Sequence, residues 1–519
     1  MTEDKNSTAD TAPTEDPAPT PESWHTKVWG RLHWEAYYWL PKLIPYPDRR
    51  DADYYRANEP EENAETRVPE DESVAVPLIW AVEMYGPAEI EGLYTALRSL
   101  RWATEESNYG RSVGAWIEKQ RAYGHGAAFF NIGLVCRPED RSKYVGARNI
   151  ADLPKDVKDL HVSIHQVTSS LTALLVGFHL QGDIVSSYQR ELQRDRSTAM
   201  RPNRRFRHIS VVTPAHRKQE FIDCARTRLR EIARDWIRSQ APGFFSSINR
   251  PSLIPTAELV VTRSTPLLAR VAGAAKAPWM DWRRLIVLPD SHSVWTSKKC
   301  KGLQFTWLRR ANPDVGHHMV ASLRTADFPK EARHYGSRDD LSQTYYCRQM
   351  LDGILVQSAA DLLVGELSRE LKETRSSMRS LGKERTKTLG TIDKIEDYFD
   401  RTIGSPIVVS EIAGRPKNEQ WYLFGCEVFV MERFDGEECT YTTELVKRIH
   451  SRATRLVSEE ESIRDHFGQL SSVLSVREGL FAQRRMERVT YIALFVAVLS
   501  LGVAILAIPA VSQWLSQSK

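Results

Sequence analysis

The spacing of apolar residues changes several times along the chain, and each change marks a predicted element. Strict alternation with polar residues, or a short unbroken apolar run, predicts a strand, whereas a spacing of three or four predicts a helix. Strands are expected at 74–85, 127–136, 160–167, 171–180, 256–263, 283–288, 302–309 and 316–324, and helices at 87–100, 113–122, 181–195 and 217–240. This mixture predicts an α+β domain with a mixed sheet over residues 73–335.

Two of these strands form a predicted hairpin around the turn at residues 168–170. Side chains alternate between the two faces of a strand. His161, Ser163 and His165 therefore share one face, and Leu160, Val162 and Ile164 share the other. With the turn centred on Ser169, His161 lies opposite Gly177 and diagonal to His179. His161 and His179 are therefore a candidate pair of metal ligands, and a polar face turned toward solvent is the alternative interpretation.

The pattern becomes helical over residues 336–488. Helices are expected at 341–381, 392–399 and 443–488, while residues 405–433 favour strands by composition and leave a helix open. The last helix carries an apolar seam with a period of 3.5 residues, formed by Ile449, Ala453, Leu456, Ile463, Phe467, Leu470, Leu474 and Phe481. This seam predicts either a coiled-coil stalk that joins copies of the chain into a homo-oligomer, or a bundle with helix 341–381.

Residues 489–511 form one uncharged apolar run of 23 residues. A helix of this length is about 35 Å long and spans the hydrocarbon core of a bilayer. Arg484, Arg485 and Arg488 precede the run, whereas the short tail at 512–519 carries one lysine. The positive-inside rule then predicts a single-pass protein of the inner or plasma membrane, with its N-terminal body in a bacterial-type cytoplasm.

The layout resembles, in outline, the cytoplasmic domain, stalk helix and membrane span of CorA-type magnesium transporters. That family has two spans where this chain has one, and no Gly-Met-Asn signature follows the span. No residue role is carried over from the family.

The N-terminal segments differ in composition from the body. Residues 1–22 are predicted to be a disordered acidic tail, and residues 23–50 an aromatic-rich helical segment that ends near Pro41. Trp24, Trp29, Trp34 and Trp39 recur every five residues, a spacing that spreads them around a helix and favours packing on the body or a partner over a one-sided membrane helix. Residues 51–72, with nine acids and two arginines, are expected to be an acidic linker.

Charge is unevenly distributed although the whole chain has a formal net charge of only +4. Residues 1–72 carry a net charge of −9, so the remainder is basic. Six cysteines without a CxxC pair or zinc-ligand spacing, and an N-terminus without a signal peptide, are typical of reduced thiols in a cytoplasm. The sequence indicates no particular cofactor.

The densest positive charge lies between Arg190 and Arg238, a segment that contains 14 lysines and arginines but only six acidic residues. At its centre, Arg201, Arg204, Arg205, Arg207 and His208 form a candidate anion- or phosphate-binding group, with a nucleic acid or lipid headgroups as partners. A solvated arginine-rich loop is the alternative.

Standard catalytic motifs, including HExxH, GxSxG and a phosphate-binding loop, are not found in the sequence. We therefore expect a non-enzymatic sensor, adaptor or effector that binds a ligand or protein partner and relays or localises it at the membrane. One alternative is a membrane-tethered enzyme or binder that acts on phosphorylated or nucleic-acid ligands through residues 190–238. A second alternative is a structural tether that forms oligomers through residues 443–488.

Overall fold

The computed structural model describes residues 24–102, 112–123, 128–144, 149–203, 205, 208–247, 253–268, 281–287, 294–308, 317–333, 339–381, 405–414, 429–432 and 437–507. The predicted tail at 1–22, the helix at 392–399 and the tail at 512–519 lie outside these residues. The expected α+β class with a mixed sheet is confirmed.

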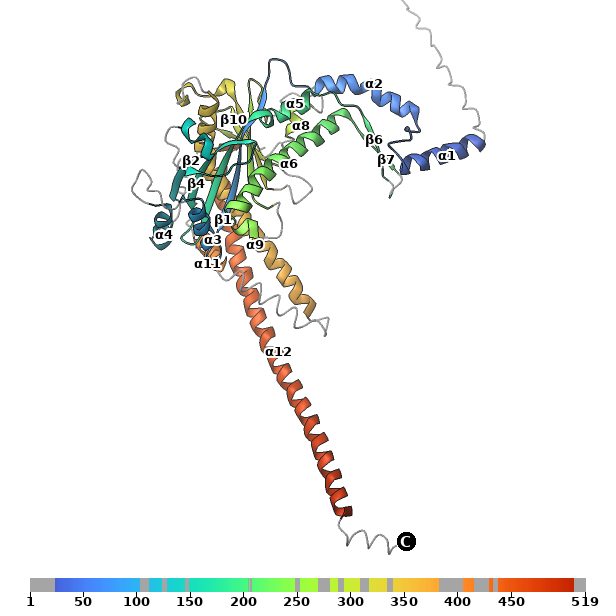
Figure 1. Ribbon diagram of the computed structural model, residues 1–519, viewed down its shortest axis with the longest axis vertical. Helices are drawn as coiled ribbons and strands as arrows, with labels where there is room; N and C mark the ends of the chain where they lie inside the picture. Colours follow the sequence, from blue (N-terminus) through green and yellow to red (C-terminus); the bar gives the residue numbers. More distant parts are fainter. Residues whose placement is uncertain are drawn as a thin grey trace, which may run out of the picture.

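In the described part of the chain, one sheet of 11 strands forms the centre of the body (Figure 1). In order across the sheet the strands are β13 (Glu438–Thr440), β12 (Phe429–Glu432), β9 (Trp295–Ser297), β10 (Leu303–Trp307), β11 (His318–Arg324), β8 (Thr256–Thr262), β1 (Val74–Tyr85), β5 (Thr172–Leu180), β4 (Val157–Gln166), β2 (Ala128–Cys136) and β3 (Asn149–Ile150). The β8–β11 and β2–β3 pairs are parallel and the other pairs are antiparallel. A separate hairpin joins β6 (Ala199–Asn203) to β7 (His208–Val212).

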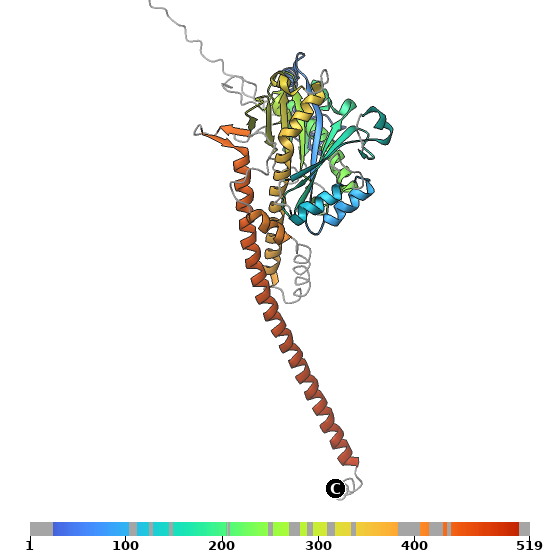
Figure 2. The ribbon, with the colours of Figure 1, turned by 90° about the vertical axis from the view of Figure 1, so that its left-hand side faces the viewer.

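Helices cover both faces of the central strands. The helices are α1 (Trp24–Trp39), α2 (Arg49–Glu65), α3 (Ile90–Ser99), α4 (Val113–Tyr123), α5 (Ser187–Gln193), α6 (Pro214–Gln240), α7 (Phe244–Ser247), α8 (Trp282–Ile286), α9 (Asp339–Leu381), α11 (Ser405–Gly414) and α12 (Tyr441–Ala507). Helices α5, α6 and α7 pack against β1 on one face, and α9 packs against β1 and β5 on the other (Figure 2). The core therefore has two layers, one on each side of the sheet.

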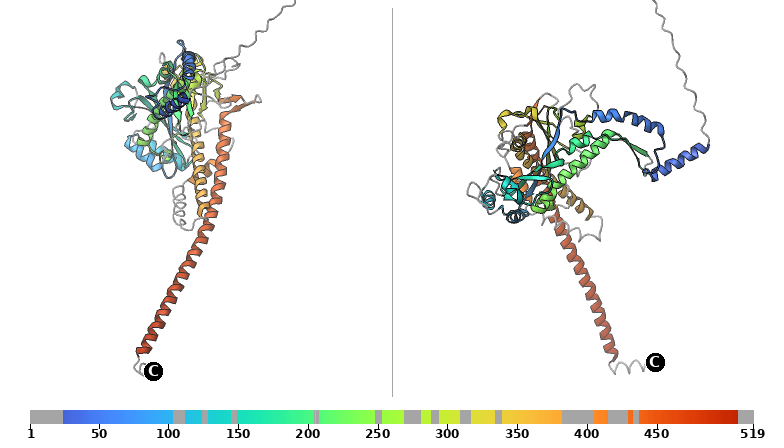
Figure 3. Two further views of the ribbon diagram at one scale, coloured as in Figure 1. Left: turned by 90° about the vertical axis from the view of Figure 1, so that its right-hand side faces the viewer. Right: turned by 45° about the horizontal axis from the view of Figure 1, so that its top comes forward.

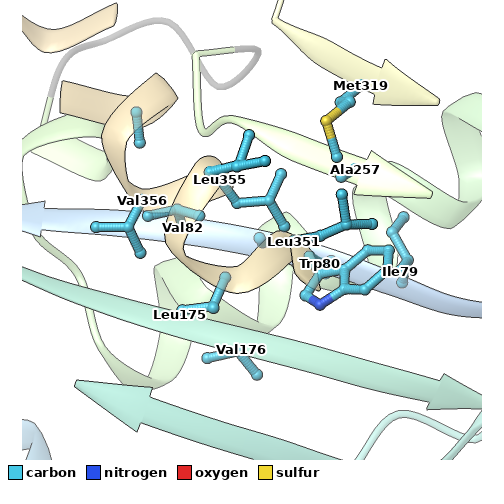
Figure 4. Packing of buried hydrophobic residues seen from close by; sticks show 14 of the residues in the cluster. Ile79, Trp80, Val82, Leu175, Val176, Ala257, Met319, Leu351, Leu355 and Val356 are labelled. Carbon is cyan, nitrogen blue, oxygen red and sulfur yellow. The ribbon is translucent and has the colours of Figure 1, made fainter. Parts of the chain in front are cut away.

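The α9 side of the core is apolar over the central strands. Figure 4 shows Leu351, Leu355 and Val356 of α9 packed over Trp80, Val82 and Leu175. Because side chains alternate along a strand, the neighbouring Ile79 and Val176 point to the opposite face. Burial on both faces explains why β1 is an almost continuous apolar run.

Four expected elements differ from the structure. Residues 405–414, whose composition favoured a strand, form helix α11, the alternative left open for this segment. Within the strand expected at 283–288, residues 283–286 belong instead to helix α8, whose N-terminus Asp281 caps by accepting a hydrogen bond from the Arg284 amide at 3.1 Å. The helix expected at 181–195 is shortened to α5, and Gly182, with φ of +67°, lies before it in the left-handed region. The expected linker at 51–72 is mostly helix α2, which Asp48 caps.

Helix α1 and the β6–β7 hairpin form an arm that extends away from the sheet with α2 (Figure 3). The Tyr37 hydroxyl donates a hydrogen bond to the Met200 carbonyl at 2.7 Å, and Trp34 packs edge-on against Tyr46. Trp24, Trp29 and Trp39 are exposed. Of the four tryptophans, Trp34 thus packs within the arm, while the other three remain accessible.

Glu72 joins the start of β1 to the loop after β8. Its carboxylate accepts hydrogen bonds from the amides of Ser264 (3.1 Å) and Thr265 (2.6 Å) and from the Ser264 hydroxyl (2.9 Å). Burial alone would raise the pKa of Glu72, but these hydrogen bonds and those from Ser73 and Arg263 outweigh it and lower the pKa to about 2.

The depressed pKa of Glu72 predicts acid-dependent stability. The stabilisation is fully present above the unfolded-state pKa of about 4.5 and is lost as the pH falls toward about 2. We expect Glu72→Gln to lower the free energy of unfolding by about 1–3 kcal/mol at pH 6. The difference from the native chain should shrink between pH 4.5 and pH 2 in denaturant titrations of the full chain. Glu70→Gln, two residues earlier, is the control, and a difference that does not vary with pH would contradict this role.

Candidate functional site

The predicted hairpin of β4 and β5 has the expected register, with His161 opposite Gly177. Asp159 lies opposite His179, which places His179 diagonal to His161 on the same face. The interpretation of this face as turned toward solvent is wrong. Helix α9 lies over it, and burial lowers the pKa values of His161 and His165. The local pattern identified the polar face but not the distant helix that covers it.

A cavity of about 440 Å³ separates this face from α9. The sheet contributes Phe129, Asn131, His161, Ser163 and His165 to its lining, and α9 contributes Tyr345, Arg348, Gln349, Asp352 and Gln357. A bulge in β2 between Asn131 and Gly133 shifts the register at this edge, and Gly133 adopts a φ of +94° that favours glycine. The volume lies in the range of small-molecule binding sites.

The charged groups of this cavity lie together on α9. Arg348 Nη2 lies 3.8 Å from Asp352 Oδ2, and the Trp80 indole N–H donates a hydrogen bond to Asp352 Oδ1 at 3.1 Å. Burial raises the pKa of Asp352 to about 6, although Arg348 and Trp80 both act to lower it. Asp352 is therefore mostly ionised at neutral pH and pairs with the cation one helical turn away.

The two histidines of the cavity are uncharged at neutral pH. Burial lowers the pKa of His165 to about 4. Burial, together with the charge of Arg348 and the neighbouring His179, holds the pKa of His161 well below its usual range. The Ser163 hydroxyl lies 2.9 Å from His165 Nε2, so these two groups form one hydrogen-bonded unit.

Three neutral side chains of the lining retain unused hydrogen-bonding groups. No hydrogen bond joins the side chains of Asn131, His161 or Gln357 to another residue within the described ranges. Gln357 is only 5% exposed. All three side chains line the cavity, so their polar groups are available there to a ligand or to solvent.

The proposed metal ligand His179 already has a protein partner. Its Nδ1 contacts Asp159, and the Tyr144 hydroxyl donates a hydrogen bond to the other Asp159 oxygen at 3.0 Å. Among the residues with assigned positions, no group of three or more His, Cys, Asp or Glu side chains is arranged to hold a metal ion. The structure thus brings His161 and His179 onto one face but supplies no third ligand there.

Much of the basic segment has structural partners. Arg201 forms two hydrogen bonds to Glu220, at 2.6 and 2.7 Å, and Lys218 is buried with its ammonium 2.9 Å from the Thr66 hydroxyl. Further arginines of α6 are buried in the core: Arg226, Arg230 and Arg234. Of the other candidate anion ligands, Arg205 and His208 are exposed, whereas Arg204 and Arg207 lie outside the described residues.

Helix α9 continues from the cavity to α12. The Asp361 carboxylate, one turn after Gln357, accepts hydrogen bonds from Arg448 and Arg452 of α12, each at 2.9 Å. The seam residues Ile449, Ala453, Leu456 and Ile463 are buried in the common core that includes α9. The first part of the seam therefore forms the intramolecular bundle that was one of the two predicted arrangements.

A second connection runs from the hairpin turn. The Glu411 carboxylate of α11 accepts hydrogen bonds from the Ser170 amide at 2.9 Å and the Ser170 hydroxyl at 2.7 Å. Helix α11 in turn packs against α12. Both walls of the cavity, the β4–β5 hairpin and α9, are thus joined to the same helix.

Helix α12 includes residues 489–507 of the predicted span. Residues Gln483–Ala504, 22 residues with a mean hydropathy of 1.7, are long and apolar enough to cross a membrane, and none of this segment is buried. Arg484, Arg485 and Arg488 are exposed at its N-terminal end.

The α9 half of the cavity does not follow from the leucine spacing that predicts helix 341–381. That spacing concerns the apolar face and leaves out the polar residues Arg348, Asp352 and Gln357. Arg348 and Asp352 are four residues apart and therefore share a helix face, a signal that was present in the sequence.

The chain matches no protein-family model, and neither a curated protein nor a solved structure shows significant similarity to it. The described residues define an α+β protein with a small-molecule-sized cavity and one candidate membrane helix.

Proposed function

We propose that the chain is a single-span, membrane-anchored, non-enzymatic ligand-binding protein of the sensor, adaptor or effector kind. A small molecule occupies the cavity between β4 and α9, and α9 and α11 relay its presence to α12. Because α12 continues into the candidate span, the relay ends at the membrane.

The observation that carries this proposal is the continuity of α9. One turn of this helix lines the cavity with Gln357, and the next turn pairs Asp361 with Arg448 and Arg452 of α12. A helix transmits displacement along its axis because its backbone hydrogen bonds hold it rigid. A ligand that shifts α9 against the sheet would therefore change the α9–α12 contact.

We place the body in the cytoplasm and the span in an inner or plasma membrane, as the positive flank of Arg484, Arg485 and Arg488 favours. The seam residues beyond Ile463 are the segment that we propose for contact with a second copy of the chain, because their period of 3.5 residues is typical of a coiled coil.

An enzyme or binder that acts through residues 190–238 is less well supported. The arginines Arg226, Arg230 and Arg234 are buried, and Arg201 is paired with Glu220. Substrate contacts by these groups would require breaking core or surface interactions first.

The relay is tested without knowledge of the ligand by filling the cavity. We expect Ser163→Phe to change amide hydrogen exchange about threefold or more in α12 residues 441–463, which corresponds to roughly 0.7 kcal/mol in opening free energy. Exchange is measured by mass spectrometry on the full chain in lipid nanodiscs. Introducing Asp361→Asn as well should reduce the effect in α12, where the connection through α11 remains, and leave the effect in α9.

Ser210→Phe, on the exposed face of β7, is the matched control and should leave α12 unchanged. If Ser163→Phe alters α9 but not α12 while Asp361 is intact, the relay is wrong.

A further inference from the structure

We infer that the cavity takes an uncharged, planar heteroaromatic ligand with hydrogen-bond donors and acceptors on its edge, of the nucleobase or nucleoside kind. This inference rests on the proposed function and names its ligand class. It follows from three properties of the lining: charge, hydrogen-bonding capacity and shape.

Among the described residues of the lining, no unbalanced charge is offered to an ionic ligand. Arg348 and Asp352 form an ion pair on α9, and His161 and His165 are neutral. An anion would have to displace Asp352 from Arg348, and a cation would have to displace Arg348 from Asp352. Burying an uncompensated charge is costly, so the cavity favours a ligand with no net charge.

The available hydrogen-bonding groups are of mixed type. The amides of Asn131 and Gln357 each offer an acceptor and two donor hydrogens, and the neutral His161 ring offers one donor and one acceptor. None of these groups is hydrogen-bonded within the part of the chain that the structure describes. A ligand that satisfies them needs donors and acceptors together, as the edges of nucleobases have.

The cavity also has a flat aromatic wall. The Phe129 ring is stacked on His165, with 5.8 Å between centroids and an interplanar angle of 27°. Phe129 is 56% exposed, so one face of this stack is accessible from the cavity mouth. An aromatic side chain of this kind stacks on any base, because every base has a π-face. A sugar without an aromatic ring would leave this surface unused.

The test is calorimetric titration of the full chain in detergent micelles with adenosine, guanosine, cytidine and uridine, and with their 5′-monophosphates. We expect at least one nucleoside to bind, and its monophosphate to bind no more tightly. Gln357→Met should weaken the binding of that nucleoside about tenfold, the usual effect of losing one buried hydrogen bond.

Gln240→Met, at the C-terminal end of α6, is the matched control and should bind the nucleoside normally. Asn131→Ala, at the other wall of the cavity, gives a second variant if Gln357→Met does not fold, which circular dichroism detects. Its expected effect is a similar loss of affinity.

Two results would overturn the inference and separate it from the proposed function. If only the monophosphates bind, and Arg348→Met abolishes their binding, the cavity is an anion site; the ligand class is then wrong while the proposed function stands. If no nucleoside or monophosphate binds, and native mass spectrometry finds no other small molecule that Ser163→Phe displaces, both proposals fail.

Discussion

Replacing Arg226 with methionine is expected to lower the free energy of unfolding by about 3–5 kcal/mol, because it leaves a buried carboxylate without its cation. Arg226 on α6 lies 2.8 Å from Glu258 of β8, and both side chains are buried on the face opposite α9. The Tyr188 hydroxyl donates a hydrogen bond to the other Glu258 oxygen at 2.6 Å. The measurement is guanidinium unfolding of the full chain in detergent, followed by tryptophan fluorescence.

The electrostatics of this group explain the size of the effect. Burial would raise the pKa of Glu258, but Arg226 and His318 outweigh it and hold the pKa far below its usual range. Burial, together with the charges of Arg230 and Arg226, lowers the pKa of His318 to about 4, so Arg226 and not His318 balances the charge of Glu258 at pH 7 in the native chain. Without Arg226, the Glu258 carboxylate loses its cation, and a proton has to be bound within the buried group or the charge stays unpaired.

The control for Arg226 lies two residues further along the same helix. Arg228 forms a 2.8 Å ion pair with Asp156, but its side chain is 68% exposed. Arg228→Met should lower the free energy of unfolding by less than about 1 kcal/mol, because an exposed ion pair usually contributes no more than that. Equal losses for Arg226→Met and Arg228→Met would contradict the structural role of the buried pair.

Trp80→Ala should also lower the free energy of unfolding by about 3–5 kcal/mol, but for a different reason. Trp80 is 1% exposed at the centre of β1, directly beneath Leu351 and Leu355 of α9 (Figure 4). Its removal leaves a void between the sheet and α9 and takes the hydrogen-bond donor from Asp352. The same denaturation experiment measures the loss, and hydrogen exchange in α9 should rise with it.

Trp29→Ala tests whether the effect depends on burial rather than on tryptophan itself. Trp29 is 72% exposed on α1, so its removal should change the free energy of unfolding by about 0.5 kcal/mol or less. A small effect of Trp80→Ala, comparable to that of Trp29→Ala, would show that α9 does not depend on this contact for its position.

Local patterns were sufficient for the elements that carry strong periodicity. The β4–β5 hairpin was predicted with its register because a short turn determines the pairing, and β1, α6 and α12 were recognised from their apolar spacing. Helix α8 was missed because its five residues are too few to show a period, and its N-terminal cap depends on Asp281.

The cavity could not be predicted in the same way. His161 and Gln357 are far apart in sequence, and their proximity depends on α9 crossing the sheet, which no local spacing encodes. The polarity of the histidine face was recognised correctly, but its exposure was not, because a polar face beneath a helix and a polar face in water have the same alternation. The basic segment shows the converse error, since the arginines of α6 have the sequence pattern of a surface yet lie in the core.

Native mass spectrometry of the full chain, released from detergent after incubation with a small-molecule extract, shows directly whether the cavity holds a ligand. We expect one small molecule bound per chain, and its loss in Ser163→Phe, where the new ring occupies the cavity. A bare native chain, or an adduct that Ser163→Phe retains equally, would contradict a ligand site between β4 and α9.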